Sequence, residues 1–542
     1  MNRRNFLSSA LLAGATAAAA SSGPGAVMQN GSEAGREVPL FELEDVSIAQ
    51  LGAGMASGKY TSRGLVEAYA RRIGSLDRQG PTLRAVLEIN PDALQIADEL
   101  DAERKSRGPR GPLHGVPILL KDNIDTADRM TTTAGSLALE GTIAPRDAFL
   151  ARKLREAGAV LLGKANLSEW ANFRGHRSSS GWSARGSQAR NPYALNRTPS
   201  GSSSGSSIAA AASLCAVAVG TETDGSIVSP ASACSCVGIK PTVGLISRSG
   251  VIPISRSQDT AGPIARTVED AAILLGAMSG ADPDDEATHS SDGKASRDYT
   301  AFLQKDGLKG ARIGVMTPSP RSIHHAARDA FVKALETMQS AGATLVNPVE
   351  LPGLRDLGSA EDLVLLYEFK AGINAYLAAR GPGSPVHSLA DLIAFNDRHA
   401  GRELPFFGQE LFIEAQKKGG LDSTEYLDAL KHCRECTRDN GIDGATDKDH
   451  LDALLMVTAG PPGPIDLVYG DAHTGGTSTL AAVAGYPSIT VPLGYCHGLP
   501  FGLSFVGRAF AEPTLIRLAY AFEQATRVRQ PPRFLPSAEL PA

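Results

Sequence analysis

Two small-residue segments carry the hydroxyl groups that could act in catalysis. The first reads GSSSGSS from Gly201, and the second reads TETDGS and ends at Ser226. Serine supplies a hydroxyl with little bulk, and glycine lets the backbone approach other groups closely. We interpret Ser226 as a nucleophile and Ser202, 24 residues upstream, as its partner. A flexible linker of this composition would not enclose an apolar run such as Ile208 to Val219.

Two lysines at the ends of apolar stretches are candidates for the base. Lys121 follows the predicted strand Val116–Leu120, and Lys164 follows the predicted strand Ala159–Gly163. A desolvated lysine loses its preference for the charged form and becomes a usable base near neutral pH. The alternative for each is a surface lysine at a strand end, and the local pattern leaves both possibilities open.

A different hydrolase arrangement also fits part of the sequence. GSSSG matches the Gly-x-Ser-x-Gly elbow with Ser203 at its centre, and Asp466 or Asp471 with His473 could complete a triad by chain order. That elbow requires a preceding strand, whereas the preceding NPYALNRTPS does not resemble one. We therefore disfavour this arrangement.

Other catalytic and metal patterns are weak. The Ser-x-x-Lys match from Ser291 to Lys294 lies in the polar segment 281–298, which we expect to be a surface loop. The sequence contains no HExxH, no phosphate-binding loop and no clustered metal ligands. Cys433 and Cys436 form a CxxC pattern inside a predicted helix, and we interpret them as free thiols.

The elements that must position these residues alternate between strands and helices. A helix over 146–157 lies between the two lysine-bearing strands, which predicts an α/β layer arrangement. Further helices are predicted over 266–278, capped by Thr267, through much of 360–440, and over 512–527. We find no internal repeat and no linker after residue 45, so one domain over 45–530 is expected.

Bulk composition excludes several classes of function. The 542 residues are 42% hydrophobic and 20% charged, which is typical of a globular protein with a large core. The formal net charge of −5 disfavours nucleic-acid binding. Outside the N-terminus no apolar run reaches ~18 residues, so we expect no membrane partner for the mature chain.

The N-terminus resembles an export signal. Asn2 to Leu7 reads NRRNFL, a twin-arginine pattern, and an alanine-rich run follows to Ala20. We therefore expect residues 1–26 to be a signal peptide and lead-in that engages the twin-arginine export machinery. The mature protein would then be periplasmic or secreted.

Longer motifs add a family resemblance. GKANLSEWANF, GWSARG, VGIKPTVGLISRSGVIP and QDTAGPIART accompany the Lys121, Ser202 and Ser226 segments in order. With them, most of residues 45–530 resembles the amidase signature family, most closely its bacterial peptide amidases. The resemblance implies an α/β fold with a mixed β-sheet of about eleven strands covered by helices on both sides. It also implies hydrolysis of peptide C-terminal carboxamides, without metal or cofactor.

The resemblance also assigns roles. Ser226 would form the acyl-enzyme, Ser202 would relay protons after a cis Gly201–Ser202 bond, and neutral Lys121 would be the base, leaving Lys164 structural. The oxyanion hole would be formed by the backbone N–H groups of four consecutive residues: Thr223, Asp224, Gly225 and Ser226.

The sequence departs from the family pattern beside the nucleophile. Glu222 stands for an aspartate, Asp224 for a glycine and Val228 for an arginine, so the usual acid–arginine pair is missing or replaced. The general family pattern therefore does not determine the substrate of this chain. The alternatives are a broad-specificity aliphatic or aryl amidase, the amidotransferase subunit that supplies ammonia for transfer-RNA-linked glutamine, and a non-enzymatic binding protein.

Overall fold

One mixed β-sheet organises the protein. In this computed structural model, which describes residues 40–318, 323–349, 351, 354, 357–472 and 474–540, eleven strands follow the order β1-β3-β2-β4-β6-β5-β10-β11-β9-β7-β8. The strands are β1 (Val86–Ile89), β2 (Pro117–Lys121), β3 (Val160–Ala165), β4 (Val217–Glu222), β5 (Val237–Lys240), β6 (Thr260–Ala265), β7 (Arg312–Val315), β8 (Thr344–Val346), β9 (Ala453–Val457), β10 (Ser488–Cys496) and β11 (Leu499–Val506). The predicted sheet of about eleven strands is confirmed.

Parallel pairing is confined to the two flanks of the sheet. Strands β3, β2 and β4 run parallel on one flank, as do β9, β7 and β8 on the other, and the pairs between β4 and β9 are antiparallel. Every residue of β2, β3 and β4 is buried. Near-continuous apolar runs are what strands covered on both faces require.

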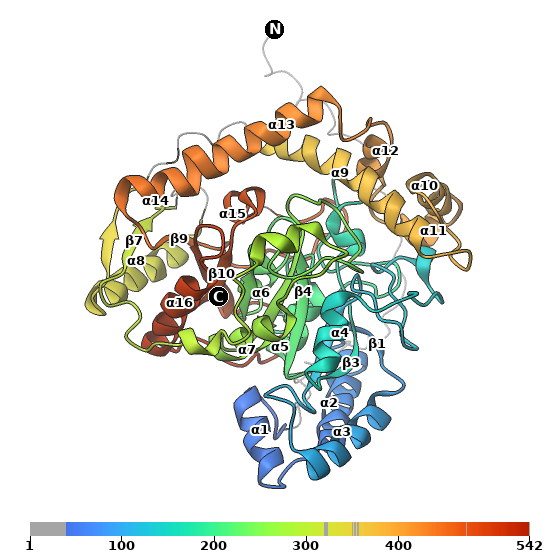
Figure 1. Cartoon of the computed structure of the whole chain (residues 1–542), viewed down its shortest axis with the longest axis horizontal. Helices are drawn as coiled ribbons and strands as arrows, with labels where there is room; N and C mark the ends of the chain where they lie inside the picture. Colours follow the sequence, from blue (N-terminus) through green and yellow to red (C-terminus); the bar gives the residue numbers. More distant parts are fainter. Residues whose placement is uncertain are drawn as a thin grey trace, which may run out of the picture. The chain divides into compact units, whose positions relative to one another are not determined.

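Helices flank this sheet (Figure 1). They are α1 (Ile48–Ala56), α2 (Ser62–Ile73), α3 (Ala93–Arg107), α4 (Phe149–Glu156), α5 (Ser204–Ala211), α6 (Val228–Ala233), α7 (Val268–Met278), α8 (His325–Ser340), α9 (Leu357–Ala379), α10 (Leu389–Arg398), α11 (Ala400–Glu403), α12 (Glu410–Gln416), α13 (Thr424–Arg434), α14 (Asp443–Asp449), α15 (Thr479–Ala484) and α16 (Glu512–Thr526). Thr267 caps α7 as predicted, because its side chain accepts the N–H of Asp270.

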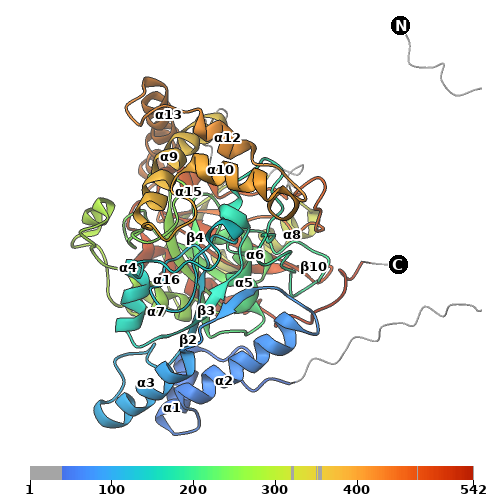
Figure 2. The same cartoon turned by 90° about the vertical axis from the view of Figure 1, so that its right-hand side faces the viewer.

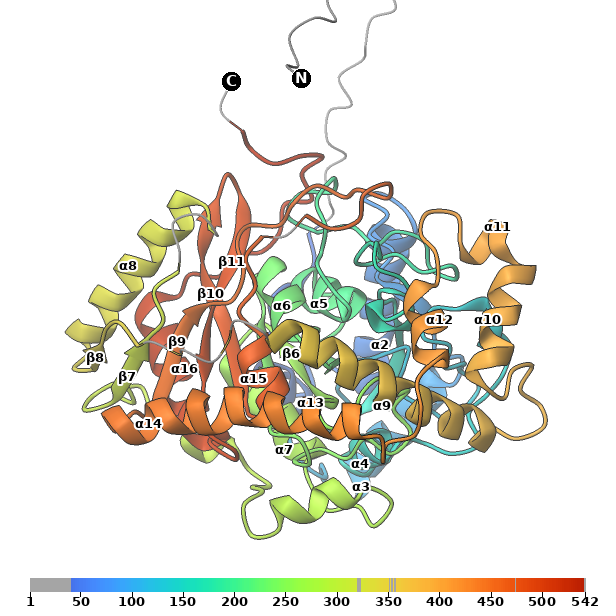
Figure 3. The same ribbon diagram turned by 90° about the horizontal axis from the view of Figure 1, so that it is seen from above.

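Residues 38–542 form one compact unit, whose helices gather in groups. Helices α1, α2 and α3 lie together at one end, and α9, α10, α12 and α13 lie together at the other (Figure 2). Helix α8 packs against β10 beside the β10–β11 hairpin (Figure 3). None of the helices in the described ranges is both long enough and apolar enough to cross a membrane.

The expectation of a surface loop over residues 281–298 is only partly right. A 3-10 helix spans Glu286–Ser291 there and buries Thr288 and Ser291. The expected signal segment, residues 1–26, lies outside the described residues, and its structure is not described.

Candidate active site

Lys121 is the last residue of β2, and its amine meets both serine-bearing segments. Its Nζ donates hydrogen bonds to Ser202 Oγ at 2.7 Å and to Thr221 Oγ1 at 2.9 Å, and it also contacts the carbonyl oxygen of Thr221 at 3.3 Å. The Lys121 side chain is fully buried. The end of β2 therefore places the Lys121 amine within hydrogen-bonding distance of the Ser202 hydroxyl.

The surroundings of Lys121 favour its neutral form. Burial lowers the pKa of this amine to about 7, against the opposing negative charges of Glu222 and Asp259. An amine with a pKa near 7 is uncharged in a substantial fraction of molecules at neutral pH. Lys121 can therefore accept a proton under those conditions.

Close backbone contacts fix the position of Ser202. The Gly201–Ser202 peptide bond is cis, as the resemblance implies. The Ser202 carbonyl accepts the N–H of Ser168 at 3.1 Å, and a Cβ on Gly201 would lie 2.3 Å from Ser168 Oγ. Only glycine therefore fits at 201 without displacing its neighbour, and the Ser202 hydroxyl faces Lys121 from a fully buried position.

Ser226 lies next to this pair through a backbone contact. The N–H of Ser203 donates to the carbonyl oxygen of Ser226 at 3.1 Å. Ser226 is 8% exposed, and its hydroxyl makes no hydrogen bond to any group in the described part of the chain, Ser202 Oγ included. The hydrogen bond from Lys121 to Ser202 is thus formed, while the Ser226 hydroxyl is uncommitted, as is common for catalytic groups before substrate binds.

The turn before Ser226 presents unused backbone donors. Within the described residues, the N–H groups of Thr223, Asp224, Gly225 and Ser226 donate no hydrogen bond. Gly225 has φ +76°, and a Cβ there would lie 2.8 Å from Ser478 Oγ, so the turn requires glycine. A run of free N–H groups beside a serine is the arrangement that stabilises an oxyanion.

The Glu222 side chain binds the backbone that follows Ser226. Its Oε2 accepts the N–H groups of Ile227 at 2.7 Å and Val228 at 3.0 Å. Burial raises the pKa of Glu222, and the positive charge of Lys240 is the largest opposing influence. The buried Lys240 is thus a positive charge that acts on Glu222, in a chain that has Val228 where the family pattern has an arginine.

A second carboxyl group lies close to Asp224. Asp224 Oδ2 accepts from Thr479 Oγ1 at 2.7 Å, while its buried Oδ1 has no partner among the described residues. Gln258 Nε2 donates to Glu361 Oε1 at 2.9 Å and contacts the Thr223 carbonyl at 3.3 Å. Burial and the charge of Asp224 raise the pKa of Glu361 to about 9, so Glu361 is protonated at neutral pH.

The rival lysine, Lys164, points to the other face of the sheet. In the parallel β2–β3 pair, Lys164 lies opposite Leu120 and Ala165 lies opposite Lys121. Successive side chains alternate between faces, so Lys121 and Lys164 project in opposite directions. Lys164 Nζ instead donates to the carbonyl of Ile124 at 2.6 Å and to Thr132 Oγ1 at 2.8 Å.

The elbow arrangement has no support in the structure. Ser203 Oγ donates to the carbonyl of Thr221 at 3.0 Å and accepts its N–H at 3.2 Å, so this hydroxyl is committed to the β4 backbone. Asp466 accepts the N–H groups of its own turn, and Asp471 accepts the N–H of Ser180. His473 lies outside the described residues.

The Ser-x-x-Lys match is local in the same way. Ser291 Oγ donates to the carbonyl of Thr288 at 2.7 Å, and Lys294 Nζ donates to the carbonyl of Ser290 at 3.1 Å. Both side chains stabilise their own turn. They contribute nothing to the Lys121 site.

The chain as a whole is similar to known proteins. The profile of the family described as Amidase matches residues 64–516. The chain belongs to the amidase family. It is 52% identical to native peptide amidase from Stenotrophomonas maltophilia, whose crystal structure superposes with a TM-score of 0.87 and covers 91% of this chain and 100% of that one.

Two further relatives agree with this assignment. A crystal structure of an amidase family protein from Bacillus anthracis is 38% identical, with a TM-score of 0.83, over 91% of this amidase and 93% of that chain. A protein of Arabidopsis thaliana named as a probable amidase is 46% identical over 505 residues, covering 91% of this chain and 93% of the relative. The resemblance drawn from the motifs is confirmed, and the protein is an enzyme that hydrolyses amides.

Sequence reasoning missed two residues of the amidase site. Thr221 Oγ1 accepts from both Lys121 Nζ and Asn123 Nδ2, each at 2.9 Å, and so fixes the direction of the amine. Asn123 follows Lys121 by two residues and Thr221 precedes the TDGS turn, so proximity in sequence was the available signal. Their partnership depends on the β2–β4 pairing, which the sequence does not give.

Proposed function

We propose that this amidase hydrolyses the C-terminal carboxamide of peptides and releases ammonia, through an acyl-enzyme on Ser226. The observation that carries the proposal is the 2.7 Å hydrogen bond from Lys121 Nζ to Ser202 Oγ, joined to the Ser226 turn by the Ser203 backbone. The buried amine is the base, Ser202 the relay and Ser226 the nucleophile.

In the acylation half, Ser226 Oγ attacks the carbonyl carbon of the substrate amide. The Ser226 proton passes to Ser202, whose own proton passes to the neutral Lys121 amine. The four free N–H groups of the turn bind the developing oxyanion, and losing one such donor typically costs ~3 kcal/mol of transition-state stabilisation. The C–N bond then breaks, and Lys121 returns its proton through Ser202 so that ammonia leaves.

In the deacylation half, water takes the place of ammonia. Its proton travels the same path to Lys121, and its oxygen attacks the ester carbonyl carbon on Ser226. Collapse of this second intermediate breaks the ester bond and returns the proton to Ser226 Oγ. The product is the peptide with a free C-terminal carboxylic acid.

Two observations support a peptide substrate over a small amide. The solved relative at 52% identity is a peptide amidase, and the match covers that whole chain. Asp224 and Glu361 also place polar carboxyl groups beside the nucleophile, suited to hydrogen bonds from peptide N–H groups. The relative from Arabidopsis is named only as a probable amidase, and that name does not separate a peptide substrate from the alternative of aliphatic or aryl amides.

A substrate panel separates these possibilities. Ammonia release is measured with a blocked dipeptide carboxamide, the amide of one amino acid, acetamide, benzamide, free glutamine and free asparagine. We expect the highest kcat/KM for the dipeptide carboxamide. Comparable values for acetamide or benzamide would support the broad amidase, and a preference for glutamine would support the amidotransferase alternative.

Inhibition gives an independent check of substrate class. A crystal structure at 52% identity is described as a peptide amidase in complex with the competitive inhibitor chymostatin. We expect chymostatin to raise KM for the dipeptide carboxamide here without changing kcat. Absence of inhibition would count against a peptide-binding cleft.

We also propose that the chain is exported by the twin-arginine route, on the pattern from Asn2 to Leu7. The test is fractionation of bacterial cells that express the full chain or an R3K/R4K double variant. Periplasmic activity should be present for the first and lost for the second. Equal distribution of the two proteins would rule out this route.

A further inference from the structure

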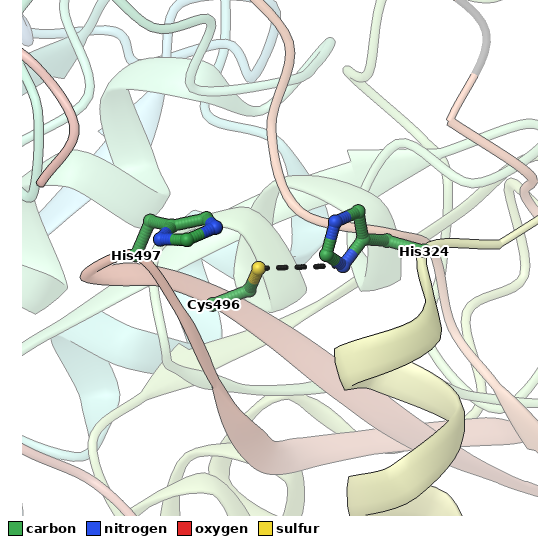
Figure 4. A group of neighbouring side chains, drawn as sticks. All are labelled: His324, Cys496 and His497. Carbon is green, nitrogen blue, oxygen red and sulfur yellow. Dashed lines mark hydrogen bonds between the residues drawn. The ribbon is translucent and has the colours of Figure 1, made fainter. Parts of the chain in front are cut away.

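We propose that His324, Cys496 and His497 form a binding site for a borderline-soft divalent metal ion such as Zn²⁺. One ligand atom from each residue lies within 4.8 Å of the other two (Figure 4). Cys496 Sγ is 3.4 Å from His324 Nδ1. Thiolate and imidazole are the ligands that Zn²⁺ prefers in proteins, whereas Mg²⁺ and Ca²⁺ prefer oxygen.

The three residues come from two elements that are far apart in the sequence. Cys496 ends β10, and His497 and Gly498 form the two-residue turn that leads into β11. Both turn residues have positive φ, 51° and 76°, as a type I′ hairpin turn requires. His324 caps α8 by accepting the N–H of Ala326 on Nδ1 at 3.2 Å, a bond that a metal ion on this nitrogen would replace, and α8 packs against β10.

The arrangement matches a tetrahedral metal ion with three protein ligands. Zn–S bonds of about 2.3 Å and Zn–N bonds of about 2.0–2.1 Å place neighbouring ligand atoms about 3.3–3.6 Å apart. The 3.4 Å pair already has this separation, and the other pairs, which are within 4.8 Å, need to close by at most about 1.5 Å through imidazole rotation. Cys496 is buried at 6% exposure beneath two exposed imidazoles, which leaves the fourth position open to water.

Such an ion would tie the start of α8 to the hairpin. The site shares no residue with the Lys121, Ser202 and Ser226 cluster. Metal binding is therefore expected to raise thermal stability without changing the rate of amide hydrolysis.

The test is calorimetric titration of the chelator-treated full chain with Zn²⁺, alongside titration with Co²⁺, whose thiolate charge-transfer absorption reports sulfur ligation. The ligand-removing variants are Cys496→Ser, His497→Asn, which suits the positive φ, and His324→Ser, which retains a helix-capping side chain. Loss of a residue that only hydrogen-bonds to a metal ligand typically weakens metal binding about 10–100-fold. Each of these three variants removes a ligand itself and should weaken binding at least as much.

Two matched controls retain the site. His325→Ala removes the neighbouring imidazole, whose ring centroid is 4.2 Å from that of His324. Cys436→Ser removes a different thiol that lies 3.6 Å from an imidazole nitrogen of His432. We expect both controls to bind one Zn²⁺ like the wild type, with the Co²⁺ thiolate band present and the melting temperature raised by metal.

The opposite pattern would overturn the proposal. Wild-type protein that binds no Zn²⁺, or that binds it equally well after Cys496→Ser, contains no such site. Binding lost in Cys436→Ser but retained in Cys496→Ser would place the ion at the Cys436 thiol instead.

Discussion

The backbone N–H of Ser203 donates a 3.1 Å hydrogen bond to the carbonyl oxygen of Ser226. This contact joins the two serine segments one residue away from the Ser202 hydroxyl. Since Ser202 in turn accepts from Lys121, a single backbone bond aligns the proposed nucleophile with the relay and the base. The following predictions test that alignment.

Substitution of Ser226 by alanine should abolish ammonia release and leave the fold intact. Its hydroxyl makes no hydrogen bond to a described residue, and the backbone carbonyl that binds Ser203 is retained. Turnover and the thermal unfolding midpoint are measured on the same preparation. Full turnover by the variant would remove Ser226 from the mechanism.

Ser203→Ala should lower stability and retain activity, which is the opposite of the effect expected for Ser226→Ala. It leaves the buried N–H of Thr221 without the Ser203 hydroxyl, which typically costs about 1–3 kcal/mol of unfolding free energy. Denaturant titration should detect this loss, while ammonia release persists below the unfolding transition. A folded but inactive Ser203 variant, paired with an active Ser226 variant, would restore the elbow alternative.

The two buried lysines should differ in their effect on catalysis. Lys121→Ala removes the amine bonded to Ser202 and should eliminate nearly all turnover. Lys164→Ala removes bonds to Ile124 and Thr132 on the opposite face, so its main effect should be on stability, with a milder loss of kcat. The reverse ranking of kcat would move the base to Lys164.

Activity should fall on the acidic side of neutrality. Because the pKa of Lys121 is lowered to about 7, the neutral amine predominates above that pH and decreases about tenfold per pH unit below it. A profile of kcat/KM against pH should show this acid limb with a slope near one. A rate that stays constant down to about pH 4 is incompatible with a lysine base.

Thr221 should act as a positioning residue for Lys121. Thr221→Val removes an acceptor that favours the charged amine, so the acid limb should move to lower pH. The Lys121 amine would also be less well oriented toward Ser202, which should reduce kcat by up to about a hundredfold. Thr221→Ser should restore both values, and a variant that changes stability alone would show Thr221 to be only structural.

The sequence predicted the parts of the site more readily than their arrangement. The apolar stretch before Lys121 predicted its strand, and the small residues around Ser202 and Ser226 predicted close packing. The direction in which Lys164 points depends on β2–β3 register, which a single sequence does not show. Because β2 and β3 are buried on both faces, they show no alternation of apolar and polar residues that would set their register.

Contacts between distant segments escaped prediction for the same reason. No motif links His324 with Cys496, which lie 172 positions apart and meet because α8 packs on β10. Likewise, the sequence showed that an arginine is absent at Val228 but did not show that the charge of Lys240 acts on Glu222. Residues with chemically useful side chains can be recognised in the sequence. The contacts of His324 with Cys496 and the influence of Lys240 on Glu222 arise only after the sheet has formed.

The most direct test of the mechanism is identification of the acylated residue. A slowly hydrolysed peptide amide is mixed with the enzyme, quenched in acid and digested, and the fragments are analysed by mass spectrometry. The acyl group should be attached to Ser226, and the adduct should be absent from the Ser226→Ala variant. An adduct on Ser202 or Ser203, or turnover with no serine adduct under conditions where the deacylation step limits the rate, would contradict the account.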